Sequence, residues 1–184
     1  HEAKRFLKDT GSFILNINDK IMQGKRSIYV FDLICRIERE TGLSLHDRYV
    51  WTKKSTLPTG SERRLNDSIE YIFHFCRKAK NRKGEYSKTK NEQIKTFTNR
   101  IRTPYSPVTL ARYNSTPMSF NDVVDEHGVV IKQEGKRLSA NPAGVVPGTV
   151  FKFDTAAAMR NSAANKHPAP FHPDLPRWFI KWLT

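Results

Sequence analysis

The sequence predicts an α/β fold built around a parallel sheet, followed by a long irregular and basic region. Helical and strand-like patterns alternate over the first 76 residues, and this alternation stops where basic residues accumulate. The chain has 184 residues, of which 38% are hydrophobic, which is enough to bury one core. We therefore expect one domain with a large irregular part.

The first elements form a helix, strand, helix, strand series. Residues 1–8 are typical of the last turns of a helix, and residues 12–17 are a nearly continuous apolar run, which predicts a strand covered on both faces. Ser27 can cap a helix that continues to about Thr41 and stops at Gly42. Its expected apolar face consists of Ile28, Phe31, Leu33, Ile34 and Ile37. With a strand after this helix, the series is a crossover unit with parallel strands.

Further strands are predicted on both sides of a polar loop. Residues 43–51 alternate, which places Leu43, Leu45, Asp47, Tyr49 and Trp51 on one face. After the loop with Pro58 and Gly60, residues 69–75 return to strand-like composition. Residues 104–148 predict loops and small strands, residues 150–153 a short strand, and residues 173–184 an amphipathic helix.

The charge of the chain favours nucleic acid as the partner. Lys and Arg outnumber Asp and Glu by 32 to 18, which gives a net charge of +14 and a pI near 10.0. The longest apolar stretch, around residues 27–37, is too short to span a bilayer. Cys35 and Cys76 lack metal-ligand spacing, so we expect two reduced core thiols in a cytoplasmic, nucleoid-associated protein. A zinc site at His167 and His172 would lack further ligands.

A group of aromatic and basic residues surrounds the polar loop and suits contact with an extruded base and its phosphates. The group consists of Trp51, Lys53, Lys54, Arg63, Arg64, Tyr71 and Phe73. The alternative interpretation is that the aromatic residues belong to the core and that the charges are merely solvated. Only the combination of an aromatic strand end, a basic loop and an aromatic strand favours nucleic-acid contact.

The order of these motifs resembles the middle of bacterial and phage DNA amino-methyltransferases, which modify N4 of cytosine or N6 of adenine. The matching order is Trp51-x-Lys53-Lys54, a Pro-containing loop, Arg63-Arg64-Leu65 and Ser68–Phe75. Phe6–Ile17 is similar to the helix, turn and strand that follow the catalytic motif of that family. Lys166–Pro176 is similar to the segment ahead of its glycine-rich S-adenosylmethionine loop.

The resemblance implies an incomplete Rossmann-like S-adenosylmethionine-dependent methyltransferase fold with an irregular basic target-recognition insert. Residues 1–76 would belong to the α/β core, residues 77–165 to the target-recognition region, and residues 166–184 to the segment leading into the cofactor half. Residues 77–105 contain ten Lys or Arg and two acidic residues. The further DNA-contacting candidates are Arg77, Lys78, Lys80, Arg82, Lys83, Arg100 and Arg102. The implied cofactor-binding residues are His167, Pro168, Ala169, Pro170 and Phe171.

The sequence departs from this family at two motifs. It has neither the Pro-Pro-aromatic motif that holds the flipped base nor the Phe-x-Gly-x-Gly cofactor loop, so no catalytic residue is assigned. Both motifs would fall just outside abrupt ends, and we expect an interior piece of a site-specific methyltransferase of a restriction-modification system or a phage. We favour cytosine N4 in double-stranded DNA and expect no activity from these residues alone. The alternative is a non-catalytic basic module that binds DNA or RNA.

Overall fold

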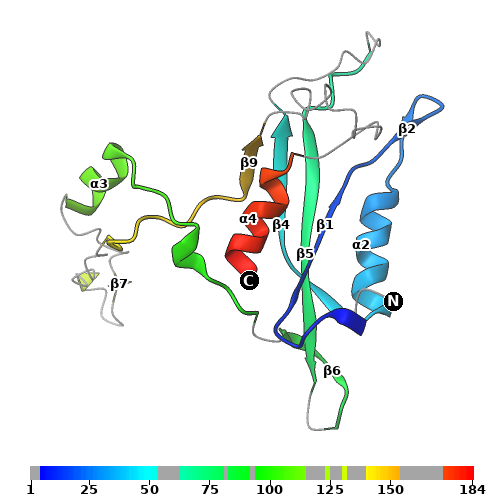
Figure 1. Cartoon of the computed structure of the whole chain (residues 1–184), viewed down its shortest axis with the longest axis horizontal. Helices are drawn as coiled ribbons and strands as arrows, with labels where there is room; N and C mark the ends of the chain where they lie inside the picture. Colours follow the sequence, from blue (N-terminus) through cyan, green and yellow to red (C-terminus); the bar gives the residue numbers. More distant parts are fainter. Residues whose placement is uncertain are drawn as a thin grey trace. The chain divides into compact units, whose positions relative to one another are not determined.

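The computed structural model describes residues 5–53, 63–80, 83–91, 94–114, 123–124, 130–131, 140–153 and 172–184. The chain forms two compact units, His1–Phe97 with Gly148–Thr184, and Thr98–Pro147. The first unit contains the main sheet with helices α2 (Tyr29–Glu40) and α4 (Asp174–Leu183) on opposite sides (Figure 1). The predicted α/β class is therefore confirmed, and helix α4 lies where the amphipathic pattern predicted a helix.

The main sheet is largely antiparallel. Its order is β1 (Ser12–Ile17), β5 (Ile69–Lys80), β4 (Leu43–Lys53) and β9 (Val150–Phe153), with β6 (Tyr86–Asn91) paired to β5. Strand β5 runs antiparallel to both β1 and β4, whereas β4 and β9 are parallel. The predicted parallel sheet is thus wrong for the first three strands. Strands β1 and β4 do run in the same direction, as a crossover requires, but β5 lies between them.

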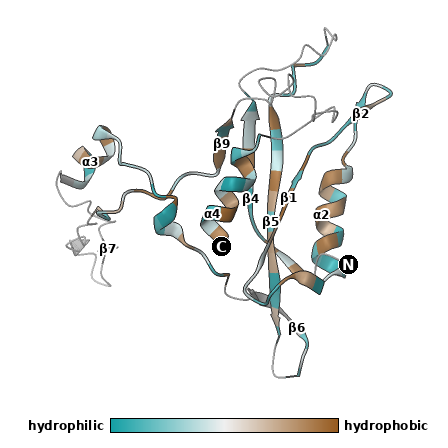
Figure 2. Cartoon of the chain, in the orientation of Figure 1, coloured by the Kyte–Doolittle hydropathy of each residue, from teal (hydrophilic) through white to brown (hydrophobic). Residues whose placement is uncertain are grey.

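Burial explains the central position of β5. Every residue from Ile72 to Cys76 in this strand is buried, whereas all six residues of β1 are only partly buried. A strand that is apolar on both faces is stabilised most when other strands flank it and helices cover it. Strand β1 is covered on both faces as expected, with Ile14 packed against one core cluster and Phe13, Leu15 and Ile17 against the other. It is less buried than β5 because it is an edge strand. Figure 2 shows hydrophobic residues along β5.

A β-bulge in β4 divides this strand between the two faces of the sheet. The register with β5 shifts between Leu45 and Asp47, so His46 is the additional residue. Because side chains alternate between faces, one additional residue reverses the parity of everything that follows it. Leu43 therefore packs on the α2 side, and Tyr49 packs on the α4 side. The prediction that residues 43–51 present one apolar face is wrong for this reason.

Each face of the sheet has its own hydrophobic cluster. The α2-side core consists of the buried residues Val30, Ile34, Leu43, Phe73 and Phe75. The α4-side core consists of the buried residues Tyr49, Trp51, Ile72, Phe151, Leu175 and Phe179. The α4-side core is rich in aromatic pairs, among them Phe151 and Trp178, whose ring centroids are 4.7 Å apart in an edge-to-face arrangement.

Helix α2 occupies the predicted range, and its predicted face is correct in part, because Ile34 is buried and Ile37 packs against the same core. Val30 and Ile34 are its buried residues, whereas Ile28 is 74% exposed and Phe31 is 45% exposed. Cys35 is also exposed, so its prediction as a core thiol is wrong, while Cys76 is buried as expected. Residues spaced by four positions share a face, so burial of Val30 and Ile34 turns these other side chains outward.

The ends of α2 follow the sequence signals. The Ser27 hydroxyl accepts a hydrogen bond from the Tyr29 N–H at 3.3 Å, although Ile28 is the residue at the N-cap position. At the other end, Gly42 has a φ of 68°, which stops the helix as predicted.

Short elements complete the described structure. Strands β2 (Ile21–Met22) and β3 (Lys25–Arg26) form a hairpin that precedes α2. The second unit contains a 3₁₀ turn (Thr98–Arg100), α3 (Pro107–Asn114), β7 (Val123–Val124) and β8 (Val130–Ile131). Among the described residues, no helix has the length and apolar character needed to cross a membrane.

Candidate nucleic-acid interface

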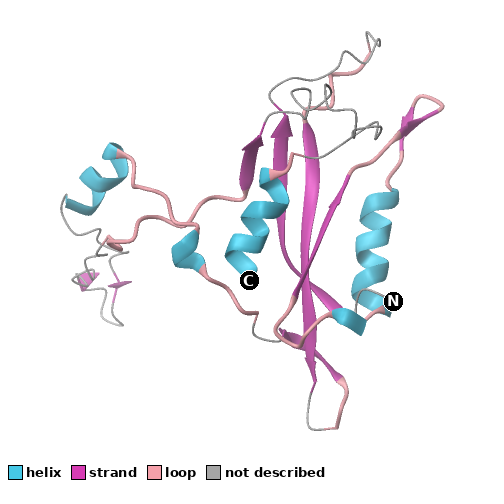
Figure 3. Ribbon diagram, viewed as in Figure 1, coloured by secondary structure: helices cyan, strands magenta, loops and turns pink. Residues whose placement is uncertain are grey.

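Three strands of the main sheet end on the same side. Strands β1 and β4 are both antiparallel to β5, and β9 is parallel to β4, so the carboxyl ends of β1, β4 and β9 point the same way (Figure 3). We call this side the carboxyl end of the sheet, and the side where β5 ends the opposite end. Ligands of open α/β sheets bind outside the carboxyl ends of strands. This end is therefore the first place to look for a functional site.

Lys53 is the predicted basic residue best defined at the carboxyl end. Its Nζ lies 2.7 Å from the Glu70 Oε1, and the two side chains are about one-fifth exposed, at 21% and 20%. The same Nζ is 5.9 Å from the centre of the Trp51 ring. Lys53 thus presents a partly exposed cation in a fixed position, with Glu70 offsetting part of its charge. Lys54, predicted to act with it, lies outside the described residues.

Trp51 does not present a ring to solvent. It is 2% exposed within the α4-side core, and its Nε1 donates a hydrogen bond to the Phe153 carbonyl at 3.2 Å. Phe73 is likewise buried in the α2-side core, at 4% exposed. These aromatic residues therefore match the alternative interpretation of the sequence, in which they are core residues, because both faces of the sheet are covered by a helix.

The arginines of the polar loop lie near the hairpin of β2 and β3. Arg64 donates a hydrogen bond from its guanidinium to the carbonyl of Gly24. Nearby, Arg26 pairs with Asp67 at 2.6 Å. Arg63 is exposed in the same segment. The described end of the polar loop is thus connected to the hairpin, and both are basic.

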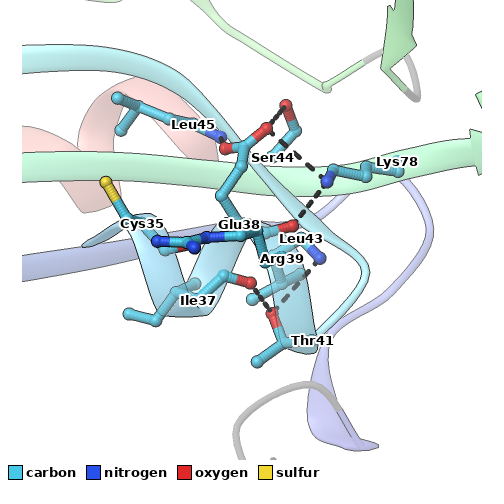
Figure 4. Close-up of polar contacts among 9 residues, drawn as sticks. All are labelled: Cys35, Ile37, Glu38, Arg39, Thr41, Leu43, Ser44, Leu45 and Lys78. Carbon is cyan, nitrogen blue, oxygen red and sulfur yellow. Dashed lines mark hydrogen bonds and ion pairs between the residues drawn. The ribbon is translucent and has the colours of Figure 1, made fainter. Parts of the chain in front are cut away.

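Two other predicted cations lie at the opposite end and hold the fold together. The Lys78 Nζ donates to the Glu38 carbonyl at 2.5 Å and lies 3.6 Å from the Glu38 carboxylate (Figure 4). That carboxylate also accepts hydrogen bonds from the Ser44 hydroxyl at 3.1 Å and the Leu45 N–H at 2.6 Å. We call these four residues the Glu38 clamp. It joins α2, β4 and β5.

Arg77 has a similar structural role. Its Nε and Nη2 donate to the Leu7 carbonyl at 3.1 and 2.5 Å, and its Nε lies 3.5 Å from the Asp9 carboxylate. Strand β5 extends to Lys80, so Arg77 and Lys78 belong to a core strand rather than to an irregular region. At about 3.3 Å per residue, Arg77 lies roughly 23 Å along β5 from Glu70.

The remaining predicted DNA-contacting residues are dispersed. Lys80 is paired with Tyr86 of β6, and Lys83 is exposed in the turn that follows. Arg82 lies outside the described residues. Arg100 and Arg102 belong to the second unit, where Arg102 donates to the Asn99 side chain at 3.0 Å and to the Gly144 carbonyl at 2.6 Å. The predicted cations therefore do not form one continuous patch within the first unit.

The predicted cofactor segment, His167–Phe171, lies outside the described residues. The chain is described again from His172, whose imidazole stacks on the Phe153 ring with centroids 5.4 Å apart and planes 8° apart. Its Nδ1 accepts the Asp174 N–H at 3.2 Å at the start of α4. Because Phe153 is the last residue of β9, this contact brings His172 to the carboxyl end of the sheet. The described residues contain no group of three or more His, Cys, Asp or Glu side chains arranged to hold a metal ion.

Sequence reasoning missed a buried polar chain centred on His74. This side chain is fully buried, with its Nδ1 3.2 Å from the Tyr49 hydroxyl and its Nε2 2.8 Å from the Ser12 hydroxyl. Burial, with a smaller contribution from the nearby His46, lowers the pKa of His74 to about 4. Burial also raises the pKa of Tyr49. His74 is therefore neutral at pH 7, and both of its ring nitrogens are used within the fold.

The mixed sheet with a helix on each face defines an α/β protein, with cations near the carboxyl end of its sheet. The chain belongs to the DNA methylase family, because the family match covers residues 1–184. This confirms the family predicted from the order of the motifs.

A sequence match and a structural match both point to PvuII DNA methyltransferase. The chain is 25% identical over 193 residues to the type II methyltransferase M.PvuII of Proteus hauseri, with 97% of this chain and 53% of the relative covered. The solved structure of the PvuII DNA methyltransferase, described as cytosine-N4-specific, matches with a TM-score of 0.56 and 21% identity, over 97% of this chain and 49% of that one. The chain spans about half the length of both relatives, and the structural match confirms the methyltransferase fold.

Proposed function

We propose that this chain is part of a site-specific DNA methyltransferase that modifies the N4 amine of cytosine in double-stranded DNA. The observation that carries the proposal is the family match over the whole chain. Support for cytosine N4 over adenine N6 comes from the matched solved structure, which is described as cytosine-N4-specific. S-adenosylmethionine, when bound, would supply the methyl group.

The carboxyl end of the sheet suits contact with the DNA around the target base. An amine inside a duplex is inaccessible, so the target nucleotide has to leave the base stack. Phosphate contacts on either side of it fix the duplex in register and help to offset this cost. We assign this contact to Lys53, Lys54, Arg63 and Arg64. Lys53 is held by Glu70, which limits the side-chain entropy lost on binding.

Cofactor binding is assigned to His167–Phe171 by resemblance. The stacking of the adjacent His172 on Phe153 supports this assignment, because His172, the residue that follows this segment in the sequence, lies at the same end of the sheet as Lys53. Proline residues in such a segment fix φ, so the wall of a binding groove loses little entropy on binding.

Target recognition is assigned to side chains within residues 77–165. Arg100 and Arg102 of the second unit remain the candidates for DNA contact in this region. Lys80 and Lys83 are set apart from them, because they lie at the opposite end of the sheet, where β5 ends. Arg77 and Lys78 join β5 to Leu7 and Glu38 at that end, and we assign these two residues a structural role.

Expression of the open reading frame that encodes these residues, from its own start codon to its own stop codon, tests the proposal. Mass spectrometry of the host DNA should detect N4-methylcytosine above the level of an empty-vector control. Detection of N6-methyladenine instead would correct the target base. Absence of both modified bases in cells that contain the folded protein would contradict the proposed activity.

The alternative function is a non-catalytic module that binds DNA or RNA, which the net charge of +14 favours on its own. The 184 residues alone lack the Pro-Pro-aromatic and Phe-x-Gly-x-Gly motifs. We therefore expect this chain to bind duplex DNA but to transfer no label from labelled S-adenosylmethionine. Transfer by this chain would show that other residues replace the absent motifs.

A further inference from the structure

We propose that the hairpin of β2 and β3, Ile21–Arg26, is a DNA-contacting element, with Gln23 at its tip facing the bases and Lys20 and Lys25 on the flanking phosphates. This inference rests on the proposed function and adds a contact surface that neither the family match nor the sequence motifs assign. In Figure 1 the hairpin projects from the sheet unit at the end where β4 and β9 terminate.

The backbone of the hairpin tip is left-handed at two successive residues. Gln23 has a φ of 49° and Gly24 a φ of 73°, and Met22 pairs with Lys25 across them. Two positive φ values in a two-residue loop are those of a type I′ turn, which suits the right-handed twist of the strands. Glycine accepts this backbone freely, but a residue with a side chain is strained in it. Gln23 therefore occupies a position where glycine would have less backbone strain.

The surface around this tip has exposed apolar side chains. Ile21 is 39% exposed, Met22 is 54% exposed, and Leu65 of the adjoining loop is 93% exposed. Some DNA-binding proteins insert exposed apolar side chains between base steps, so apolar groups beside cations suit contact with DNA. A glutamine among them can donate and accept hydrogen bonds at the base edge.

The charged side chains of the hairpin are all positive. Residues 20–26 contain Lys20, Lys25 and Arg26 and no acidic residue. Arg26 is engaged by Asp67 at 2.6 Å. Within the described part of the chain, neither Lys20 nor Lys25 makes an ion pair. These two ammonium groups are available to phosphates, which favours a polyanionic duplex over an uncharged partner.

The hairpin is anchored at both its tip and its base. Arg64 donates to the carbonyl of Gly24 at the tip, and the Arg26–Asp67 pair holds the second strand. At the base, the Ser27 N–H donates to the Lys20 carbonyl at 2.9 Å. The preceding Asn18 donates from its side chain to the Ile69 carbonyl at 3.0 Å. A hairpin held in this way loses little conformational entropy when it contacts DNA.

Three variants of the 184-residue chain test this proposal, with duplex-DNA affinity measured by fluorescence anisotropy at several salt concentrations. Lys20→Ala with Lys25→Ala should weaken binding by roughly tenfold or more near 0.1 M salt and reduce the log–log salt slope by about 1.8. Gln23→Gly should weaken binding by about fivefold, with an unchanged or higher melting temperature. Arg36→Ala with Arg39→Ala removes the same charge from the exposed side of α2 and should leave both values nearly unchanged.

The outcomes separate this inference from the proposed function. If the unmodified chain binds DNA with a steep salt dependence but both hairpin variants bind as tightly as it does, the hairpin role is wrong and the proposed function stands. If the unmodified chain does not bind DNA, both are contradicted. If the hairpin variants lose binding only to vesicles of anionic phospholipid, the surface is a membrane contact and the inference is overturned.

Discussion

Lysine and arginine have different roles at the two ends of the sheet. At the opposite end, Lys78 and Arg77 donate to the backbone carbonyls of Glu38 and Leu7, and their function is to join elements. At the carboxyl end, Lys53 is held in place with part of its charge exposed, and the adjoining hairpin carries Lys20 and Lys25. Charge alone therefore does not identify a binding surface. The direction of the donors, toward the fold or toward solvent, separates the two roles.

Acidification should have the largest effect on stability, through His74 between the two ends of the sheet. The pKa of His74 is about 4 in the folded chain, against an ordinary value near 6.5 in the unfolded chain. Below pH 6.5 the unfolded chain binds the additional proton, so stability is complete above this value and decreases as the pH falls toward 4. The expected loss is about 3 kcal/mol, with a slope of at most about 1.4 kcal/mol per pH unit.

Denaturant unfolding between pH 7.5 and pH 4 measures this loss, and His74→Gln provides the comparison. Glutamine can still hydrogen-bond to the hydroxyls of Tyr49 and Ser12 but does not titrate. The variant should therefore lose this part of the pH dependence. An equally steep decrease in the variant would assign the effect to other groups.

Removal of the Glu38 carboxylate tests the structural role of the cations at the opposite end of the sheet. Glu38→Ala leaves the Leu45 N–H without its acceptor and the partly buried Lys78 with only the backbone carbonyl of residue 38, and we expect a loss of about 2 kcal/mol. DNA affinity of the folded variant should remain the same. Glu40→Ala on the same helix is the control, because its pair with Arg36 is exposed and should contribute less than about 0.5 kcal/mol.

Lys53→Met should have the smallest effect on stability and a measurable effect on binding. The Lys53–Glu70 pair is partly exposed, so its loss should cost less than about 1 kcal/mol. The salt slope of DNA binding should decrease by about 0.9, the value for one phosphate contact. If affinity and slope equal those of the unmodified chain, Lys53 belongs with Lys78 as a structural cation.

Local sequence patterns were sufficient for most of the elements. The apolar run at residues 12–17, Gly42 after α2 and the amphipathic pattern before Thr184 all correspond to observed boundaries. Strand order was not predictable in this way, because the insertion of β5 between β1 and β4 depends on pairing between distant segments. The bulge at His46 was missed for a related reason, since strict alternation of Leu43 to Trp51 gives no local signal for an additional residue.

The family of the protein was predictable from the sequence, but the contacts of the individual residues in the candidate site were not. The order of the motifs predicted the DNA methylase family, which the comparison confirmed. The roles of single cations depended on partners far along the chain, such as Glu38 for Lys78 and Leu7 for Arg77. The hairpin did have a local signal, a Gln-Gly pair between Ile21-Met22 and Lys25-Arg26, which a search for two-residue turns would have found.

Amine-reactive footprinting of the chain with and without duplex DNA, read by mass spectrometry, tests the difference between the two ends most directly. Lys80 and Lys83 are exposed near the opposite end and serve as internal references for Lys20, Lys25 and Lys53 at the carboxyl end. We expect DNA to protect Lys20, Lys25 and Lys53 while Lys80 and Lys83 react at an unchanged rate. Protection of Lys80 and Lys83, with Lys20, Lys25 and Lys53 still reactive, would contradict the assignment of the carboxyl end as the DNA-facing side.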